Sequence, residues 1–221
     1  MAVEGEFPKV DGDVLYASEA NNIKYLQNLK FSEGFMYTAI DTNIWAETGT
    51  GGGTVTSLDN SRWKGYMDGS SNGVVKLDSD VGYNKASTII CSFRLQTINE
   101  SSLSTTETFY GCGISDRGAP SSHFAILSHT SGTSWRLSTK DGSTEEDSSP
   151  FVVDFSTEKE VKIIIDSSNA KIYIDGVLKA TNSTNLPSLT QSLGLRFGFA
   201  NNTTSVATTV YINKIHMLTE E

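Results

Sequence analysis

The stretch KIYIDGVLKAT, residues 171–181, predicts a tight β-hairpin more strongly than any other part of the chain. The pair Asp175-Gly176 lies between two short runs that are rich in β-branched and other apolar residues. An Asp-Gly pair suits the positive φ angles of a type I′ turn, whose twist matches that of paired strands. We therefore expect two antiparallel strands joined at Asp175 and Gly176.

Strand signals separated by turn residues recur on both sides of this hairpin. In the segment 87–96, apolar residues recur at every second position, so they share one face that we expect to lie in the core; they are Ile89, Cys91, Phe93 and Leu95. Many short strands at such spacing predict two packed sheets. The expected strands are 35–40, 53–58, 62–67, 73–78, 87–96, 108–115, 123–129, 134–139, 160–166, 170–175, 177–181, 193–200 and 208–218.

Composition is that of a folded protein and argues against two classes of partner. Hydrophobic residues make up 37% of the chain and charged residues 19%. The net charge is −9, and Lys and Arg are scattered rather than clustered, so there is no electrostatic footprint for a nucleic acid. The longest apolar run is far shorter than the roughly 20 residues of a membrane helix. We expect neither nucleic-acid binding nor membrane insertion.

Residues 10–30, VDGDVLYASEANNIKYLQNLK, depart from the β pattern and predict a short α-helix. Ser18 is a good N-cap residue, and Glu19 places an acidic side chain in the first turn. Asp11, Gly12 and Asp13 are typical of a turn before the helix, and from Ser18 onwards no Gly or Pro interrupts the run before Gly34. The chain therefore combines a helical N-terminal segment with a β domain.

The predicted helix carries one apolar stripe, formed by Ile23, Leu26 and Leu29. An isolated helix of about 12 to 15 residues is marginal in water, so the stripe must be buried. Its partner is either the chain's own β domain or other copies of the helix. We expect a mounting or oligomerisation segment at 1–31 and a β-sandwich at 32–221.

The sequence GDVLYASEANNI, residues 12–23, resembles a motif of tailed-phage proteins. In that motif, Gly-Asp-x-(Leu/Val/Ile)-x-Ala-x-x-x-Asn-(Asn/x)-(Ile/Leu) lies near the N-termini of fibre, baseplate and neck proteins and typically precedes an oligomerising helix. Gly12, Asp13, Ala17 and Asn22 carry the match. The resemblance implies a homo-oligomer, with a trimer favoured, that binds other virion proteins.

The remainder of the chain resembles the concanavalin-like, laminin-G-like jelly-roll superfamily. Four pieces follow the order usual in that superfamily: IDTNIW ending at Trp45, NGVVKL at 72–77, the hairpin at 171–181 and YINKIHM at 211–217. The resemblance implies a double-sheet jelly roll whose concave sheet and rim loops often bind glycans. It does not imply an enzymatic activity.

The sequence offers little catalytic chemistry. A glycosidase of this fold would carry Glu-x-Asp-x-x-Glu on one strand, which directs paired carboxylates into one groove, and no such stretch occurs. The run Glu145, Glu146 and Asp147 lies in a Ser-rich stretch that we expect to be a solvated loop. We expect no enzyme, with a glycoside hydrolase or lyase of non-standard active site as the alternative.

Glycan binding requires an exposed aromatic platform beside hydrogen-bonding side chains. Trp135 is the best candidate platform because it lies on an expected strand between polar loops. A tryptophan half buried under a loop is the alternative. The candidate partners at the rim are Arg136, Asp116, Arg117, Asn201 and Asn202.

A metal cofactor is not expected. The histidines lack the spacing of a zinc site, and no EF-hand-like run is present. Calcium is the alternative, since laminin-G-like domains often hold one ion with aspartates and loop carbonyls. The aspartates near expected strand ends are Asp78, Asp80, Asp116, Asp141 and Asp166.

Two cysteines are too few for a disulfide framework. If 87–96 and 108–115 were adjacent antiparallel strands with Gln96 opposite Glu107, Cys91 would lie opposite Cys112. Two buried thiols in a protein assembled in a reducing cytoplasm are the favoured alternative.

The N-terminus MAVEGEFPKV is acidic and has no apolar core of a signal peptide, so nothing in it directs Sec export. We expect assembly in a host cytoplasm and a place in a virion. The expected role is that of a non-enzymatic tail-fibre, baseplate or decoration module that adheres to a cell-surface glycan. A host lectin or adhesin module is the alternative.

Overall fold

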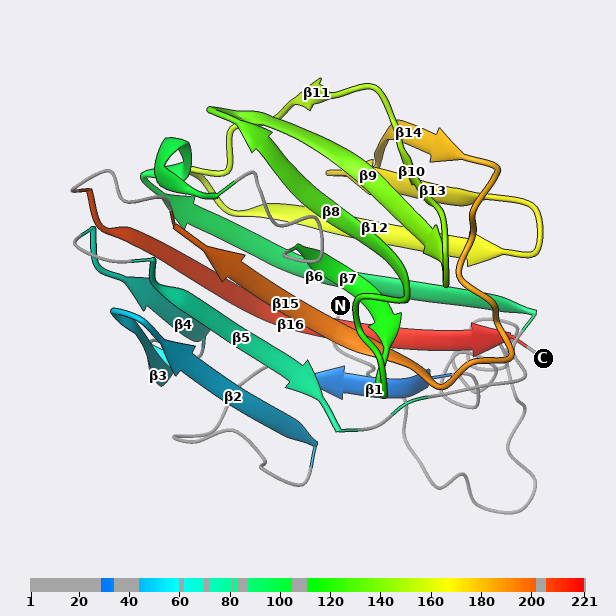
Figure 1. Ribbon diagram of the computed structural model, residues 1–221, viewed down its shortest axis with the longest axis horizontal. Helices are drawn as coiled ribbons and strands as arrows, with labels where there is room; N and C mark the ends of the chain where they lie inside the picture. Colours follow the sequence, from blue (N-terminus) through cyan, green and yellow to red (C-terminus); the bar gives the residue numbers. More distant parts are fainter. Residues whose placement is uncertain are drawn as a thin grey trace, which may run out of the picture.

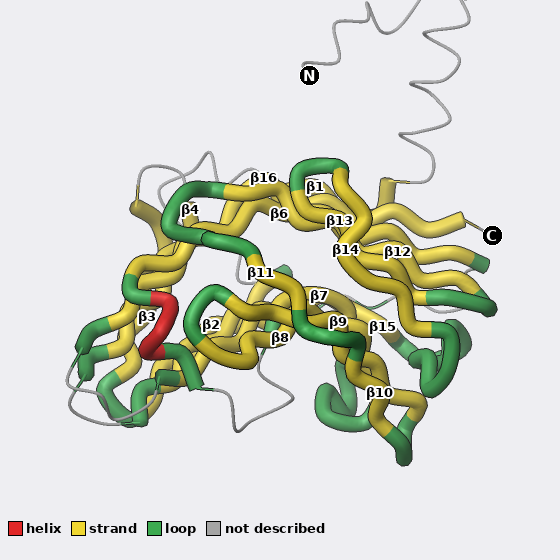
Figure 2. The backbone as a smooth tube through the Cα atoms, turned by 90° about the horizontal axis from the view of Figure 1, so that it is seen from above, coloured by secondary structure: helices red, strands yellow, loops and turns green. Residues whose placement is uncertain are grey.

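In the computed structural model, the described residues are 29–33, 44–59, 62–69, 72–80, 82, 87–104, 111–201 and 206–220. They form two packed antiparallel sheets, which Figure 1 shows face-on and Figure 2 shows as two layers. Within these ranges the single helical element is the short 3-10 turn Glu100–Ser102, and no helix is long and apolar enough to cross a membrane. The predicted all-β, two-sheet sandwich is confirmed.

The first sheet contains the predicted hairpin and the two longest strands, β6 and β16. Its strands are β1 (Leu29–Glu33), β3 (Gly53–Asp59), β4 (Arg62–Met67), β6 (Thr88–Ile98), β12 (Lys159–Asp166), β13 (Ala170–Ile174), β14 (Val177–Asn182) and β16 (Thr208–Glu220). They follow the order β14-β13-β12-β6-β16-β4-β3. The long strand β16 pairs with β6 along one edge, and with β4 and then β1 along the other.

The second sheet lies in front of the first in Figure 1. Its strands are β2 (Trp45–Thr50), β5 (Val74–Ser79), β7 (Cys112–Asp116), β8 (His123–Ser131), β9 (Ser134–Asp141), β10 (Glu145–Asp147), β11 (Phe151–Val152) and β15 (Leu193–Ala200). They follow the order β10-β9-β8-β7-β15-β5-β2, and β11 pairs with β9. The chain crosses between the sheets several times, so segments far apart in sequence become neighbours.

The core lies between the two sheets. The alternating residues from Ile89 to Leu95 on β6 are buried, as their period-two pattern predicts. Across the interface, the rings of Phe93 and Phe197 meet edge-to-face with centroids 5.0 Å apart. Burying one such side chain contributes about 1.5–3 kcal/mol, so this contact helps to hold the sheets together.

The predicted hairpin is confirmed. β13 and β14 pair as antiparallel neighbours, with Ile174 opposite Val177. Asp175 has a φ of 49° and Gly176 a φ of 78°, which are the two positive angles that a type I′ turn requires. The Asp175 carboxylate also accepts a hydrogen bond from the Glu160 backbone N–H at 2.9 Å, which ties the turn to β12.

Some predicted elements differ from the structure. The expected strand at 35–40 lies outside the described residues, and β1, β2, β10 and β11 were not predicted. The acidic run Glu145–Asp147 is not a solvated loop: it is strand β10, paired with β9. Its carboxylates have local partners. Nη1 of Arg136 lies 2.7 Å from Oδ2 of Asp147, and the carboxylate of Glu146 accepts hydrogen bonds from the backbone N–H and the hydroxyl of Thr184.

Most of the predicted N-terminal helix, including Ile23 and Leu26, lies outside the described residues. Leu29 is not helical, since it begins β1 and pairs with Leu218 of β16. The part of β16 beyond β4 offers backbone groups to pair with, and strand pairing satisfies them. β1 crosses the expected boundary between residues 31 and 32, and the division into two segments remains a prediction.

The cysteines do not lie on adjacent strands. Cys91 belongs to β6 of the first sheet and Cys112 to β7 of the second, and Glu107 lies outside the described residues. Both thiols are free and fully buried, and burial raises the pKa of each. The cross-strand register is therefore wrong, and the alternative of two buried thiols is confirmed.

Candidate functional site

Trp135 does not form an exposed platform, because its ring is only 1% exposed. Its indole N–H donates a hydrogen bond to the buried carboxylate of Glu100. The ring also meets Phe155 and His129 edge-to-face, each with centroids 5.0 Å apart. Trp135 thus belongs to the core, and its expected exposure is wrong.

Two further candidate residues are engaged within the protein. Asn201 is 2% exposed; its side-chain oxygen accepts a hydrogen bond from the Gly73 N–H at 2.7 Å, and its amide donates to the Asp68 carbonyl. Arg136 of β9 forms an ion pair with Asp147 of β10, and strands β8 and β7 separate β9 from β15. Asn202 lies outside the described residues. The predicted set is therefore not assembled as one site.

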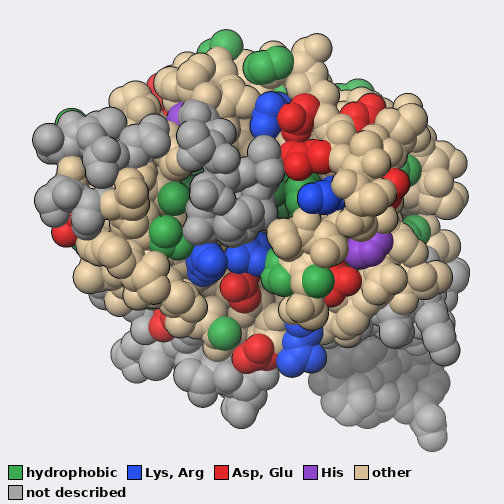
Figure 3. All heavy atoms as spheres, in the orientation of Figure 1, with side chains coloured by type: hydrophobic (Ala, Val, Ile, Leu, Met, Phe, Trp, Pro, Cys, Tyr) green, Lys and Arg blue, Asp and Glu red, His purple; other side chains and the backbone are tan. Residues whose placement is uncertain are grey.

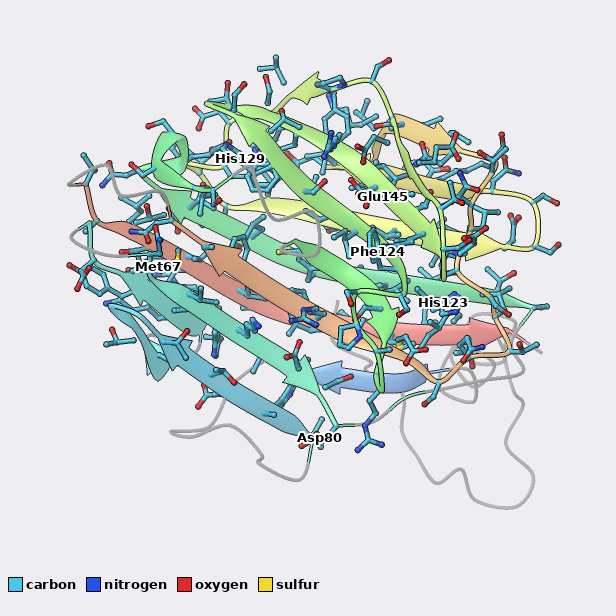
Figure 4. All side chains as sticks on the ribbon, in the orientation of Figure 1. Met67, Asp80, His123, Phe124, His129 and Glu145 are labelled. Carbon is cyan, nitrogen blue, oxygen red and sulfur yellow. The ribbon has the colours of Figure 1, made fainter. Side chains whose placement is uncertain are left out.

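The remaining two candidates, Asp116 and Arg117, do lie together. They line a pocket of about 340 Å³ that opens where β5 and β7 end and β15 begins. Figure 4 shows Asp80 just beyond the end of β5. We call this pocket the rim pocket; the lining residues that matter below are Asp78, Asp80, Ser115, Asp116, Arg117 and Gly194.

An ion pair joins one lining residue of the rim pocket, Asp78, to Arg196 on the neighbouring strand. Asp78 of β5 lies directly opposite Arg196 of β15 in the sheet, and Oδ1 of Asp78 is 3.5 Å from Nε of Arg196. Arg196 is only 6% exposed. Burial raises the pKa of Asp78, while the guanidinium of Arg196 and the ammonium of Lys76 act in the opposite direction.

Asp116 shapes the turn that follows β7. Its Oδ1 accepts hydrogen bonds from the Gly118 N–H at 2.7 Å and the Ala119 N–H at 3.0 Å, as Asp side chains commonly do in turns. The Arg117 N–H donates to the Ser192 carbonyl at 3.0 Å, which anchors the turn to the start of β15. These contacts fix the backbone at Arg117, which lines the pocket.

The guanidinium of Arg117 and the carboxylate of Asp80 face each other at the mouth of the rim pocket. Nη2 of Arg117 is 4.0 Å from Oδ1 of Asp80, which is longer than a direct hydrogen bond. The side chains are 51% and 44% exposed, respectively. Figure 3 shows acidic and basic side chains next to one another on the lower part of the same face. The mouth thus presents both an acceptor and a donor to solvent.

The aspartates considered as calcium ligands do not form a metal site in the part of the chain that the structure describes, where no group of three His, Cys, Asp or Glu side chains could hold an ion. The carboxylates of Asp141 and Asp166 each stabilise the turn that follows them: each accepts hydrogen bonds from the backbone N–H groups of the second and third residues after it. Asp78, Asp80 and Asp116 share the rim pocket without forming such a group.

Sequence reasoning considered Asp78 and Asp80 only as alternative calcium ligands and did not select Arg196 at all. The signals for them are visible in the sequence: LDSD places two carboxylates two residues apart at a strand end, and LGLRFGFA places one arginine in an otherwise apolar strand. What the sequence does not reveal is that β5 and β15 are neighbours.

No protein-family model and no curated protein matches this sequence. Solved structures do share its fold. The binding domain of botulinum neurotoxin DC in complex with SialylT matches with a TM-score of 0.60 and 17% identity over 88% of this chain and 48% of that one. A botulinum neurotoxin type C structure, from work on cell entry through two ganglioside molecules, matches with a TM-score of 0.59 and 16% identity over 90% and 50%.

A structure from work on endo-acting O-glycanases of the human gut microbiota matches with a TM-score of 0.66 and 12% identity, and covers 88% of this chain and 100% of that one. This chain spans about half the length of the neurotoxin chains that it matches. At these identities the likeness establishes the fold, a two-sheet β-sandwich, and the function has to be argued from the site.

Proposed function

We propose that this chain is a non-enzymatic carbohydrate-binding module and that the rim pocket holds the sugar. The observation that carries the proposal is the pocket itself, which combines carboxylates, a guanidinium and a serine hydroxyl in about 340 Å³. Ligand pockets typically measure about 300–1,000 Å³ and fix their ligands with a few placed polar groups. Sugar hydroxyls both donate and accept hydrogen bonds, so they match such a lining.

The same lining sets the expected strength of binding. Apolar contact is limited to residues such as Ala46, Pro120 and Leu195. Hydrogen bonds to charged groups contribute about 1.5–3 kcal/mol each, much of which offsets the ordering of ligand and side chains. A single site therefore binds weakly, and several linked sites gain avidity without any new contact.

This need for several copies agrees with the proposed place of the protein, a phage virion. The motif at residues 12–23 and the apolar residues Ile23 and Leu26 of the predicted helix support a homo-oligomer, with a trimer favoured, that is mounted on other virion proteins. In this proposal the sandwich is displayed as a tail-fibre, baseplate or decoration module. A host lectin or adhesin would instead be encoded beside secretion genes rather than beside tail or capsid genes.

A glycoside hydrolase or lyase is the second candidate, because Asp78 and Asp80 share one pocket and burial raises the pKa of Asp78. A raised carboxyl pKa is typical of a general acid. We favour binding because Asp78 is engaged by Arg196 at 3.5 Å. Depolymerisation of a polysaccharide panel that is lost in Asp78→Asn would establish the enzyme instead.

The test of binding is a broad glycan array probed with the folded protein, with Arg117→Ala and with the control Arg94→Ala. Arg94 pairs with Glu158 at 3.0 Å on the first sheet and does not line the rim pocket. The wild type and Arg94→Ala should bind the same glycans, and Arg117→Ala should lose most of the signal. A folded wild type that binds no glycan would refute the proposal.

A further inference from the structure

The rim pocket has a gap at its mouth that a ligand hydroxyl can fill. Nη2 of Arg117 and Oδ1 of Asp80 are 4.0 Å apart, and both side chains are substantially exposed. A single oxygen can lie about 2.8 Å from both atoms, which is an ordinary hydrogen-bond distance. That oxygen would accept a hydrogen bond from Arg117 and donate one to Asp80. Of the common ligand groups, a neutral hydroxyl does both.

Charged ligand groups satisfy one side of this gap and conflict with the other. A carboxylate or sulfate only accepts hydrogen bonds, so it would suit Arg117 but place a negative charge beside Asp80. An ammonium group only donates, so it would suit Asp80 but place a positive charge beside Arg117. The gap therefore discriminates against charge of either sign.

The rest of the lining adds to the discrimination against anions. Asp78 and Asp116 also face the pocket. The guanidinium of Arg196 is engaged by Asp78 and is almost completely buried, and Lys76 acts on Asp78 without lining the pocket. Among the described lining residues, Arg117 is thus the one cation, against three carboxylates.

Resting on the function proposed above, we infer that the rim pocket selects neutral glycans over acidic and amine-bearing ones, and that a ring hydroxyl bridges Arg117 and Asp80. A mismatched charge leaves a polar group of the pocket unsatisfied, which costs about 1–3 kcal/mol, or roughly five- to hundred-fold in affinity. Like charges in contact increase that cost.

The test is an array on which each neutral glycan, such as N-acetyllactosamine, N-acetylchitobiose or mannotriose, is printed beside its sialylated, sulfated or de-N-acetylated counterparts. Wild-type protein should prefer the neutral members by about tenfold or more over their charged counterparts. Asp80→Asn removes the negative charge at the gap, so it should reduce the discrimination against acidic members. Arg117→Ala should weaken binding to all members.

The matched controls are Glu158→Gln and Arg94→Ala, each of which removes one charge of a partly exposed ion pair outside the rim pocket and should change neither affinity nor preference. Tighter binding of an acidic or amine-bearing member would overturn the inference and leave the proposed function standing. The inference would also be overturned if Asp80→Asn and Arg117→Ala bound the same glycans as the wild type with the same strength. Failure of the folded protein to bind any member would overturn the proposed function too.

Discussion

Glu100 is a buried carboxylate whose hydrogen bonds connect three segments of the chain. It is 7% exposed and accepts hydrogen bonds from the Trp135 indole, from the Phe155 N–H at 3.1 Å and from the Thr97 hydroxyl at 3.2 Å. Burial raises the pKa of this carboxyl, and the three donors act against that rise. Through these hydrogen bonds, Glu100 links the 3-10 turn to β9 and to the segment after β11.

Glu100→Gln should destabilise the protein by about 1–3 kcal/mol, because an amide offers one acceptor oxygen where three donors converge. The measurement is urea unfolding followed by tryptophan fluorescence. The control is Glu158→Gln, which removes the charge of a partly exposed ion pair and should cost at most about 1 kcal/mol. If the two variants lost the same free energy of unfolding, the hydrogen bonds of Glu100 would not stabilise the fold in the way described.

His129 should make the free energy of unfolding depend on pH. Burial lowers its pKa from 6.5, and the backbone groups of Gly132, Ser104 and Leu103 oppose that change. A lowered folded-state pKa means that the unfolded chain binds more protons just below pH 6.5, so acidification destabilises the fold. Burial lowers the pKa of His216 as well, with the same sign, whereas the raised pKa of Glu100 acts with the opposite sign.

The measurement is urea unfolding between about pH 7.5 and about pH 5.5, the range in which histidine titrates. The wild type should lose stability across this range, and His129→Gln should lose less. His216→Gln is the companion variant, and it should remove part of the remaining dependence. A pH dependence that is unchanged in His129→Gln would contradict the assignment.

The residue scale is where prediction from sequence was weakest. Trp135 and Leu137 lie two residues apart on β9 and share a buried face, so the period-two pattern that identified the core face of β6 was a signal that Trp135 belongs to the core. Asp116 and Arg117 were predicted as ligand partners and do line one pocket, although their role in binding remains a proposal. The residue that faces Arg117 at the pocket mouth is Asp80, which follows β5 and is far away in sequence.

Among the elements, the hairpin of β13 and β14 gives the clearest test of backbone geometry. Gly176 has a φ of +78°, and a Cβ added there would meet no atom within 4 Å. Gly176→Ala should therefore destabilise the protein by about 1 kcal/mol through backbone conformation alone. Gly176→Asn should cost less, since Asn tolerates the left-handed region. Thermal unfolding compares the two, and an Ala variant as stable as the Asn variant would contradict the turn assignment.

Elements with an alternating pattern were predictable from the sequence, and short or polar edge elements were not. β6 and β15 have the clear periodicity of strands that line a core, and both were found. β10 and β11 are only three and two residues long and lie at the margin of the second sheet, where little burial imposes a pattern. β1 overlaps the C-terminal end of the predicted helix. It could not be predicted as a strand from its own residues, because its pairing partner, β16, lies at the far end of the chain.

At the scale of the whole molecule, the apolar stripe of the predicted helix gives the test of self-association. Ile23→Asp together with Leu26→Asp should dissociate an oligomer, because each introduces a charge into an interface that excludes water. The measurement is size-exclusion chromatography with light scattering on the chain of residues 1–221. The unfolding midpoint should stay within error if the sandwich is independent of the stripe. A wild type that remains monomeric at high concentration would contradict the mounting role.

The site at this scale is a product of topology rather than of any motif. The rim pocket joins residues at 78–80, at 115–117 and at 194, which only the order β7-β15-β5 brings together. Sequence periodicity predicts that these strands exist but not which of them are neighbours. The sandwich was therefore predictable from local patterns, whereas the pocket required the arrangement of the strands.

The most direct test of the account is a nuclear magnetic resonance titration of isotope-labelled protein with the glycan that binds best on the array. The account predicts that the largest backbone shifts fall at Asp78–Ser79–Asp80, at 115–119 and at Gly194. The same titration of Arg117→Ala should show much smaller shifts at equal glycan concentration. Shifts confined to another surface, such as the Asp175-Gly176 turn, or no shifts at all, would contradict carbohydrate binding at the rim pocket.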